Sequence, residues 1–213
     1  MGTRGGDMNN ILEQEYEWII RLQADATLGL NNTERLGAVA CLQLVIDRLK
    51  LDDHVLVIGG DTLFYEDFSL SDIITRFRKL EAANNETNLV LTYFCKDEET
   101  SKYGILEVDE NQKVTSMLEK PAPNETESRK ACPCFYLLSK QCIPLVRVFL
   151  DEKKEAPVEQ KDAPGIFISW LIRRKPVYAY HVSGRFDVGT LLTYIECDRY
   201  FQEKANAWRD YLK

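Results

Sequence analysis

Two short, continuously apolar runs stand out in the first half of the chain. They are "HVLVIGG" at positions 54–60 and "NLVLTYF" at positions 88–94. Runs of this kind are typical of strands that are covered on both faces. Between them, Ser69 with Asp72 three residues later predicts a helix start, after which apolar residues recur at helical spacing. The order strand, helix, strand predicts a parallel sheet with a right-handed crossover.

Helical spacing also precedes the first run. Apolar residues at positions 39, 42, 45, 46 and 49 mark one face of a helix. We expect Thr33 to cap the start of this segment, because threonine is a favoured residue at helix N-termini.

The pattern changes in the second half of the chain. The stretch "GILEVDENQKVTSMLEKP" at positions 104–121 holds two alternating runs joined by a polar turn, which predicts a hairpin. The further expected elements are a strand at 134–138, helices at 139–150 and 165–174, a strand at 177–182 and a helix from Thr190. Together these elements predict an α/β protein with a Rossmann-like, three-layer mixed sheet that is mostly parallel. The segments 55–58, 89–94 and 177–182 are expected to be neighbouring central strands, within a single domain spanning 1–213.

The amino-acid composition limits the kinds of molecule that the protein is expected to bind. The 213 residues carry a net charge of -7, and the basic residues are scattered, so the chain is not expected to bind nucleic acid. No apolar run reaches the ~18 residues of a membrane span and no secretory signal is evident, so we expect a cytoplasmic protein that does not enter membranes. The six cysteines form no CxxC pair, which argues against a zinc site or a disulfide framework.

Two aspartates follow predicted strands. Asp61 ends the run "VLVIGGD", and Asp187 follows "VYAYHVSGRF". Ligands of open α/β sheets gather at the carboxyl ends of the strands. Two carboxylates in one such crevice would suit Mg²⁺ together with a phosphorylated ligand. The alternative is that each aspartate only caps a helix or stabilises a turn, and for either residue alone both interpretations remain open.

A second candidate is "LEKP", which closes the predicted hairpin. Glu119 is able to accept protons of sugar hydroxyls in hydrogen bonds, while Lys120 is able to meet a phosphate. A charged pair beside a proline is also ordinary loop material, and that interpretation stays open as well.

Taken in order, four fragments resemble the sugar nucleotidyltransferases, the nucleoside-diphosphate-sugar pyrophosphorylases. The fragments are "RLGAVACL", "VLVIGGDTLF", "KYGILEVDENQKVTSMLEKP" and "GRFDVGTLLTY", and the resemblance covers about residues 33–200. It implies the nucleotide-diphospho-sugar transferase type of fold. It also implies an enzyme that joins a sugar-1-phosphate to a nucleoside triphosphate and releases pyrophosphate, with Mg²⁺ as cofactor. Oligomers are common in this family, so a homo-oligomer is expected by analogy.

The resemblance also implies roles for individual residues. Asp61 and Asp187 would hold Mg²⁺, and with Lys120 they would form the catalytic set. The other substrate-binding positions it implies, beside Lys120 at the sugar phosphate, are Glu119 at the sugar hydroxyls, Tyr103 and Gly104 in the sugar pocket, and Gly37 near the base.

The first residues depart from the family pattern. Members of the family open with a strand and a Gly-rich loop that cradles the triphosphate. Here "MGTRGGDMNN" holds only Gly2, Thr3 and Arg4 of that loop, so residues 1–32 are interpreted as divergent or truncated. We therefore expect this chain alone to form nucleotide sugar very slowly or not at all. The alternative function is a catalytically impaired relative that binds a sugar phosphate or a partner subunit for recognition or regulation.

Overall fold

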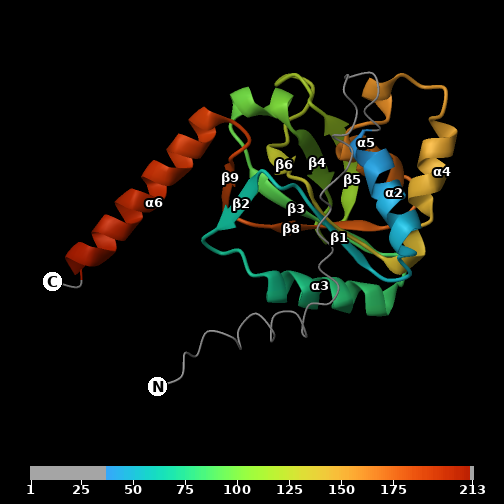
Figure 1. Cartoon of the computed structure of the whole chain (residues 1–213), viewed down its shortest axis with the longest axis horizontal. Helices are drawn as coiled ribbons and strands as arrows, with labels where there is room; N and C mark the ends of the chain where they lie inside the picture. Colours follow the sequence, from blue (N-terminus) through green and yellow to red (C-terminus); the bar gives the residue numbers. More distant parts are fainter. Residues whose placement is uncertain (1–36, 212–213) are drawn as a thin grey trace. The chain divides into compact units, whose positions relative to one another are not determined.

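The computed structural model describes residues 37–211. Within these residues, a seven-stranded sheet and a two-stranded ribbon are combined with helices (Figure 1). The helices are α2 (Ala38–Leu49), α3 (Leu70–Ala83), α4 (Leu145–Glu152), α5 (Pro164–Leu171) and α6 (Leu191–Tyr211). The strands are β1 (Val55–Ile58), β2 (Thr62–Tyr65), β3 (Asn88–Phe94), β4 (Gly104–Val108), β5 (Val114–Glu119), β6 (Lys130–Cys132), β7 (Phe135–Leu138), β8 (Val177–His181) and β9 (Gly184–Asp187).

The direction of the strands corrects one prediction. The α/β class is confirmed, but the expectation of a mostly parallel sheet is wrong, because among the described strands only β3 and β8 pair in parallel. The strands β1 and β3 run in the same direction, yet β7 lies between them and is antiparallel to both. The prediction that these three strands are neighbours is therefore confirmed for β3 and β8, which pair directly, and is wrong for β1, which pairs with β7. A short apolar run reports that a strand is buried, and it carries no information on the direction of its neighbours.

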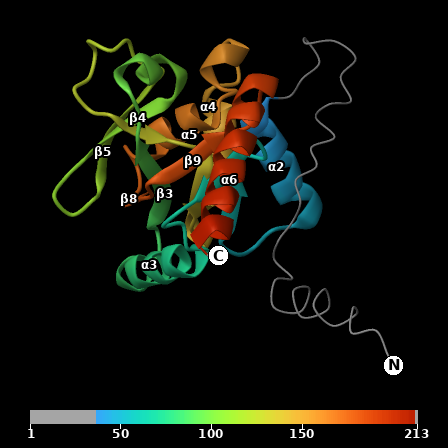
Figure 2. The ribbon, with the colours of Figure 1, turned by 90° about the vertical axis from the view of Figure 1, so that its left-hand side faces the viewer.

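Helices cover both faces of the sheet. Consecutive strand residues point to opposite faces, so Leu137 packs with α3 while Leu138 packs with α2, α4 and α5. Figures 1 and 2 show α3 on one side of the sheet and these three helices on the other. The three-layer arrangement is therefore confirmed.

Two helix starts can be compared with their predictions. The Ser69 hydroxyl accepts a hydrogen bond from the backbone N–H of Asp72 at 3.3 Å, which confirms the predicted cap of α3. For α2, the capping position is Gly37, where φ is +85°. The Asp162 carboxylate accepts the backbone N–H of Ala38 at 2.6 Å and satisfies one of the free donors of that helix end. The predicted cap, Thr33, lies outside the described residues.

The predicted hairpin is confirmed as β4 and β5, whereas β2, β6 and β9 were not predicted. The ribbon strands β2 and β9 follow closely on the apolar runs of β1 and β8, which were themselves predicted as strands, so they did not stand out. Helix α6 extends from this ribbon, where Tyr200 and Phe201 pack against Tyr65 and Phe186. Among residues 37–211, no helix is both long and apolar enough to cross a membrane.

We expect Phe135→Ala to lower the free energy of unfolding by about 3–5 kcal/mol, because the ring is fully buried in the strand between β1 and β3. Phe94→Ala is the matched control, since Phe94 is also a strand phenylalanine but is 66% exposed. Its cost should stay below about 1 kcal/mol. Urea unfolding of both variants measures the difference, and equal losses would contradict the assigned core.

Candidate functional site

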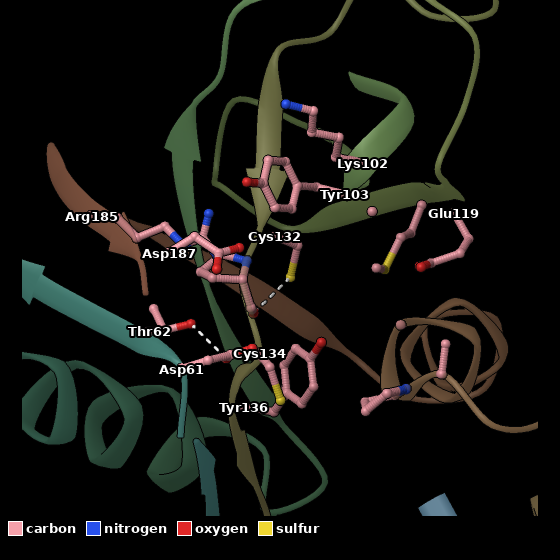
Figure 3. A pocket seen from close by; sticks show the side chains of 16 residues that line it. Asp61, Thr62, Lys102, Tyr103, Glu119, Cys132, Cys134, Tyr136, Arg185 and Asp187 are labelled. Atoms are coloured by element: carbon pink, nitrogen blue, oxygen red, sulfur yellow. Dashed lines mark hydrogen bonds and ion pairs between the residues drawn. The ribbon is translucent and has the colours of Figure 1, made fainter. Parts of the chain in front are cut away.

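A cavity of about 210 Å³ opens where four parts of the chain meet. Its lining comes from the β2–β9 ribbon, the β4–β5 hairpin, the segment around β6 and β7, and the start of α5. In Figure 3, Asp61 and Asp187 lie on one side of this space and Glu119 lies on the other.

The two predicted aspartates lie close together in this cavity. A Cβ atom placed on Gly189 would lie 3.1 Å from Oδ1 of Asp187 and 3.2 Å from Oδ2 of Asp61. Both carboxylates therefore border one small space. The backbone N–H of Gly189 donates to Oδ1 of Asp187 at 3.0 Å, which fixes the orientation of that carboxylate.

The ribbon explains why these aspartates meet. In the β2–β9 pairing, Thr62 is directly opposite Asp187, and Asp61 precedes Thr62 in the chain. The backbone N–H of Val188 also donates to the carbonyl oxygen of Asp61 at 2.7 Å. The expected reason was different: two parallel strands were to deliver both residues at one sheet edge. The convergence holds, but an antiparallel ribbon produces it.

Three of the predicted sugar-side residues line the same cavity: Tyr103, Gly104 and Glu119. Gly104 is opposite Glu119 in the hairpin, so the strand register places them together. Burial raises the pKa of Glu119 above its ordinary value of 4.5, and the Lys120 charge opposes this only in part. Within residues 37–211, the Glu119 carboxylate accepts no hydrogen bond, so its oxygens remain available to a ligand.

Two other predicted site residues do not line the cavity. The side chain of Lys120 is exposed, and its backbone adopts a left-handed conformation with φ of +51° while its N–H donates to the Tyr103 carbonyl at 3.1 Å. Gly37 packs instead against Asp162, whose chain leads into Ala163 and Pro164 at the cavity wall. Sequence adjacency to Glu119 suggested that Lys120 shares its crevice, but Lys120 lies one residue past the end of β5, where the left-handed backbone ends the strand.

Sequence reasoning missed most of the lining, including Lys102, Gly165 and Arg185. Arg185 precedes Asp187 by two positions on a strand, and alternate strand residues share a face, so this spacing was a usable signal. For Gly165, a side chain would overlap the Glu119 carboxylate, and only the packed structure reveals that restriction.

The cavity also holds cysteines, which the described structure leaves as free thiols. Burial and the Asp61 charge raise the pKa of Cys134 to about 11, so at neutral pH it is a thiol and not a nucleophilic thiolate. Among residues 37–211, no group of three or more His, Cys, Asp or Glu side chains is arranged to hold a metal ion. A cation held here by Asp61 and Asp187 would therefore take its remaining ligands from water and from a bound substrate.

The sequence model of one family, described as "Nucleotidyl transferase", matches residues 6–204. Two curated relatives are the glucose-1-phosphate adenylyltransferases of Trichlorobacter lovleyi and Lachnospira eligens. Each is 26% identical, over 163 and 147 residues respectively, and each alignment covers 68% of this chain. The matches cover 37% and 32% of those proteins, so the chain spans about a third of the length of these relatives.

Solved structures share the fold. An apo UDP-glucose pyrophosphorylase superposes with a TM-score of 0.64 at 22% identity, covering 79% of this chain and 61% of that one. A UTP-bound UGPase from Acinetobacter baumannii superposes with a TM-score of 0.61 at 19% identity, covering 93% of this chain and 70% of that one.

Gly184→Ala should weaken the ribbon. A Cβ at this position would lie 2.7 Å from the backbone oxygen of Tyr65, and a backbone atom cannot move away without breaking the β2–β9 pairing. We expect a loss of about 1–3 kcal/mol in the free energy of unfolding, the usual cost of overpacking. Gly60→Ala is the control, because a Cβ there would meet nothing within 4 Å. Equal stability of the two variants in urea unfolding would be inconsistent with the ribbon geometry.

Glu119→Gln should change how stability depends on pH. Folding raises the pKa of Glu119. The contribution of this residue to the free energy of unfolding is therefore complete below its ordinary pKa of 4.5 and is lost as pH rises through the folded pKa. Glutamine resembles the protonated acid and avoids that loss. The stability of the variant relative to the wild type should therefore increase from about pH 4 to pH 7, as measured by urea unfolding at several pH values. If the difference in stability between the variant and the wild type were the same at every pH in this range, the pKa of Glu119 would not be raised by folding.

Proposed function

The chain belongs to the nucleotidyl transferase family, and on that premise we propose that it joins a sugar-1-phosphate to a nucleoside triphosphate and releases pyrophosphate. The observation that carries the proposal is the shared cavity, which Asp61 and Asp187 border on one side and Glu119, Tyr103 and Gly104 on the other. Reactions of this kind depend mainly on positioning and on charge neutralisation, and these side chains are suited to both.

The carboxylate side suits a magnesium ion. Asp61 and Asp187 provide hard oxygen donors close to one point. Mg²⁺ is commonly bound by one or two carboxylates together with waters and substrate phosphates, so two side chains are a sufficient protein contribution. The bound ion would neutralise charge on the triphosphate oxygens.

The hairpin side suits a sugar. Glu119 lines the cavity, its carboxylate accepts no hydrogen bond from the described part of the chain, and sugar hydroxyl groups are donors that such oxygens accept. Gly104 and Gly165 lack side chains where the Glu119 carboxylate packs, so the acid is held against the wall of the cavity. Tyr103 contributes a ring that is able to cover a sugar face.

Cationic side chains have separate roles in this proposal. Lys102 belongs to the cavity lining, and its ammonium group would meet a phosphoryl group. Lys120 is exposed beside the cavity and would reach the sugar phosphate only by turning its side chain inward. Gly37, at the start of α2, remains the position proposed to lie near the base. A homo-oligomer remains an expectation by analogy.

The reaction can be written for these residues. An oxygen of the sugar-1-phosphate attacks the α-phosphorus of the triphosphate, and the bond from that phosphorus to the pyrophosphate leaving group breaks. The carboxylates of Asp61 and Asp187 would hold an ion that supplies charge neutralisation, and Glu119 would orient the sugar so that the attacking oxygen is in line. The attacking oxygen belongs to a phosphate monoester, which is already ionised at neutral pH because its second pKa is about 6, so this step needs no general base.

Asp61→Asn and Asp187→Asn should each reduce pyrophosphate release by about 100-fold or more, because each replaces a charged oxygen donor by a neutral amide. Release is measured with a sugar-1-phosphate, Mg²⁺ and each common nucleoside triphosphate. Asp109→Asn is the control, since Asp109 lies in the hairpin turn, where its side chain accepts backbone N–H groups as asparagine also does.

A binding measurement separates the proposal from its alternative. Calorimetric titration of nucleoside triphosphate with Mg²⁺ requires no turnover, and an enzyme of this type should bind the nucleotide in a way that depends on Asp61 and Asp187. A chain that binds a sugar phosphate but no nucleotide would instead be a recognition or regulatory module.

A further inference from the structure

Arg185 is a buried cation inside the cavity. It lies on β9, its side chain is only 7% exposed, and it belongs to the cavity lining. Burial of a guanidinium group is unfavourable unless counter-charges and hydrogen-bond acceptors replace the lost water. The groups that contact Arg185 therefore indicate the role of this side chain.

The partners of Arg185 satisfy it incompletely. One terminal nitrogen donates to Oδ2 of Asp187 at 3.2 Å, and the other donates to the Tyr93 hydroxyl at 2.9 Å. The guanidinium carbon lies 5.1 Å from the ring centre of Tyr93 and 4.7 Å from that of Tyr103. The Nε atom is buried and has no acceptor among residues 37–211. One carboxylate is therefore the only negative charge paired with this buried cation within the described residues.

That carboxylate is also one of the two proposed ligands of the divalent ion. An ion at Asp61 and Asp187 would compete with Arg185 for the charge of Asp187, because a carboxylate cannot fully neutralise both cations. On losing this partner, the guanidinium group would need a new acceptor. A phosphoryl group presents two oxygens that match the paired N–H donors of arginine, and the ligand brings such groups into the cavity.

We propose that Arg185 is an exchangeable counter-cation: it neutralises Asp187 while no divalent ion is bound, and it donates to a phosphoryl oxygen of the ligand once the ion takes Asp187. This inference rests on the proposed function and adds a second phosphate contact to it. The rings of Tyr93 and Tyr103 hold the guanidinium plane in place during the exchange, so only its hydrogen-bond partners change.

The test compares Arg185→Gln and Arg185→Lys with the wild type in two titrations without catalysis. Mn²⁺ binding is followed by electron paramagnetic resonance, and pyrophosphate binding is followed by calorimetry with and without Mn²⁺. Arg174→Gln is the matched control, because Arg174 also lies over an aromatic ring, that of Trp170 at 3.9 Å, and pairs with Glu152 outside the cavity. Thermal unfolding by circular dichroism establishes that each variant is folded.

The two ligands should respond in opposite directions. Arg185→Gln should bind Mn²⁺ about tenfold more tightly, because a competing positive charge a few ångströms away is removed. The same variant should bind pyrophosphate about tenfold more weakly in the presence of Mn²⁺. Arg185→Lys keeps the charge and loses the planar pair of donors, so its Mn²⁺ affinity should stay near that of the wild type while pyrophosphate affinity falls. Arg174→Gln should change neither.

Several results would overturn the proposal. Mn²⁺ affinity that is unchanged or weaker in a folded Arg185→Gln variant would show that the arginine does not compete for Asp187. Pyrophosphate affinity that is unchanged would show that it does not reach the ligand. If both occur while the wild type binds Mn²⁺ and releases pyrophosphate in the assay, the counter-cation role fails and the proposed function stands. A wild type that binds neither Mn²⁺ nor nucleotide would overturn both.

Discussion

The pairing of β2 with β9 is the interaction on which the candidate site depends. Asp61 and Asp187 are far apart in the chain, and four cross-strand pairs, from Thr62 with Asp187 to Tyr65 with Gly184, bring them to one end of a short ribbon. Carboxylates repel each other, so this proximity is sustained by the backbone hydrogen bonds and the aromatic packing of the ribbon and not by the carboxylates themselves. When both aspartates are ionised, we therefore expect a positively charged group or ion close to them.

Charge balance explains how the rest of the cavity is arranged. Arg185 provides a positive charge beside Asp187. For Glu119, on the opposite wall, burial raises the pKa, and the charge of Lys120 offsets this only in part. The two walls therefore differ chemically. In the proposed function, the first wall would take a cation and phosphoryl groups, and the second would offer a carboxylate to hydroxyl donors. This division matches the two halves of a nucleotide sugar.

Local sequence signals predicted the parts of the fold that depend on local physics. Ser69 caps α3 as expected, and the alternating runs after Gly104 form the expected hairpin. Long-range pairing was less accessible, because the insertion of β7 between β1 and β3 depends on how distant strands compete for the same edge. The ribbon strands were missed because each follows closely on an apolar run that was itself predicted as a strand.

The part of the candidate site that lies in short sequence motifs was also predictable. Asp61, Asp187, Tyr103, Gly104 and Glu119 lie in motifs that could be recognised, and the structure brings these five together at the cavity. Lys120 and Gly37 were assigned with them by chain proximity or resemblance and lie outside the lining. Arg185 was overlooked although its spacing of two positions from Asp187 on a strand was a usable signal, and only the structure reveals its packing against the rings of Tyr93 and Tyr103.

The most direct test of the central claim is a crystal structure of the protein with Mn²⁺ and a nucleotide sugar, read by the anomalous scattering of manganese. We expect a single anomalous peak about 2.1 Å from carboxylate oxygens of both Asp61 and Asp187, with the sugar hydroxyls facing Glu119. A peak elsewhere on the protein, or a nucleotide sugar bound outside this cavity while both aspartates contact only backbone N–H groups, would contradict the account.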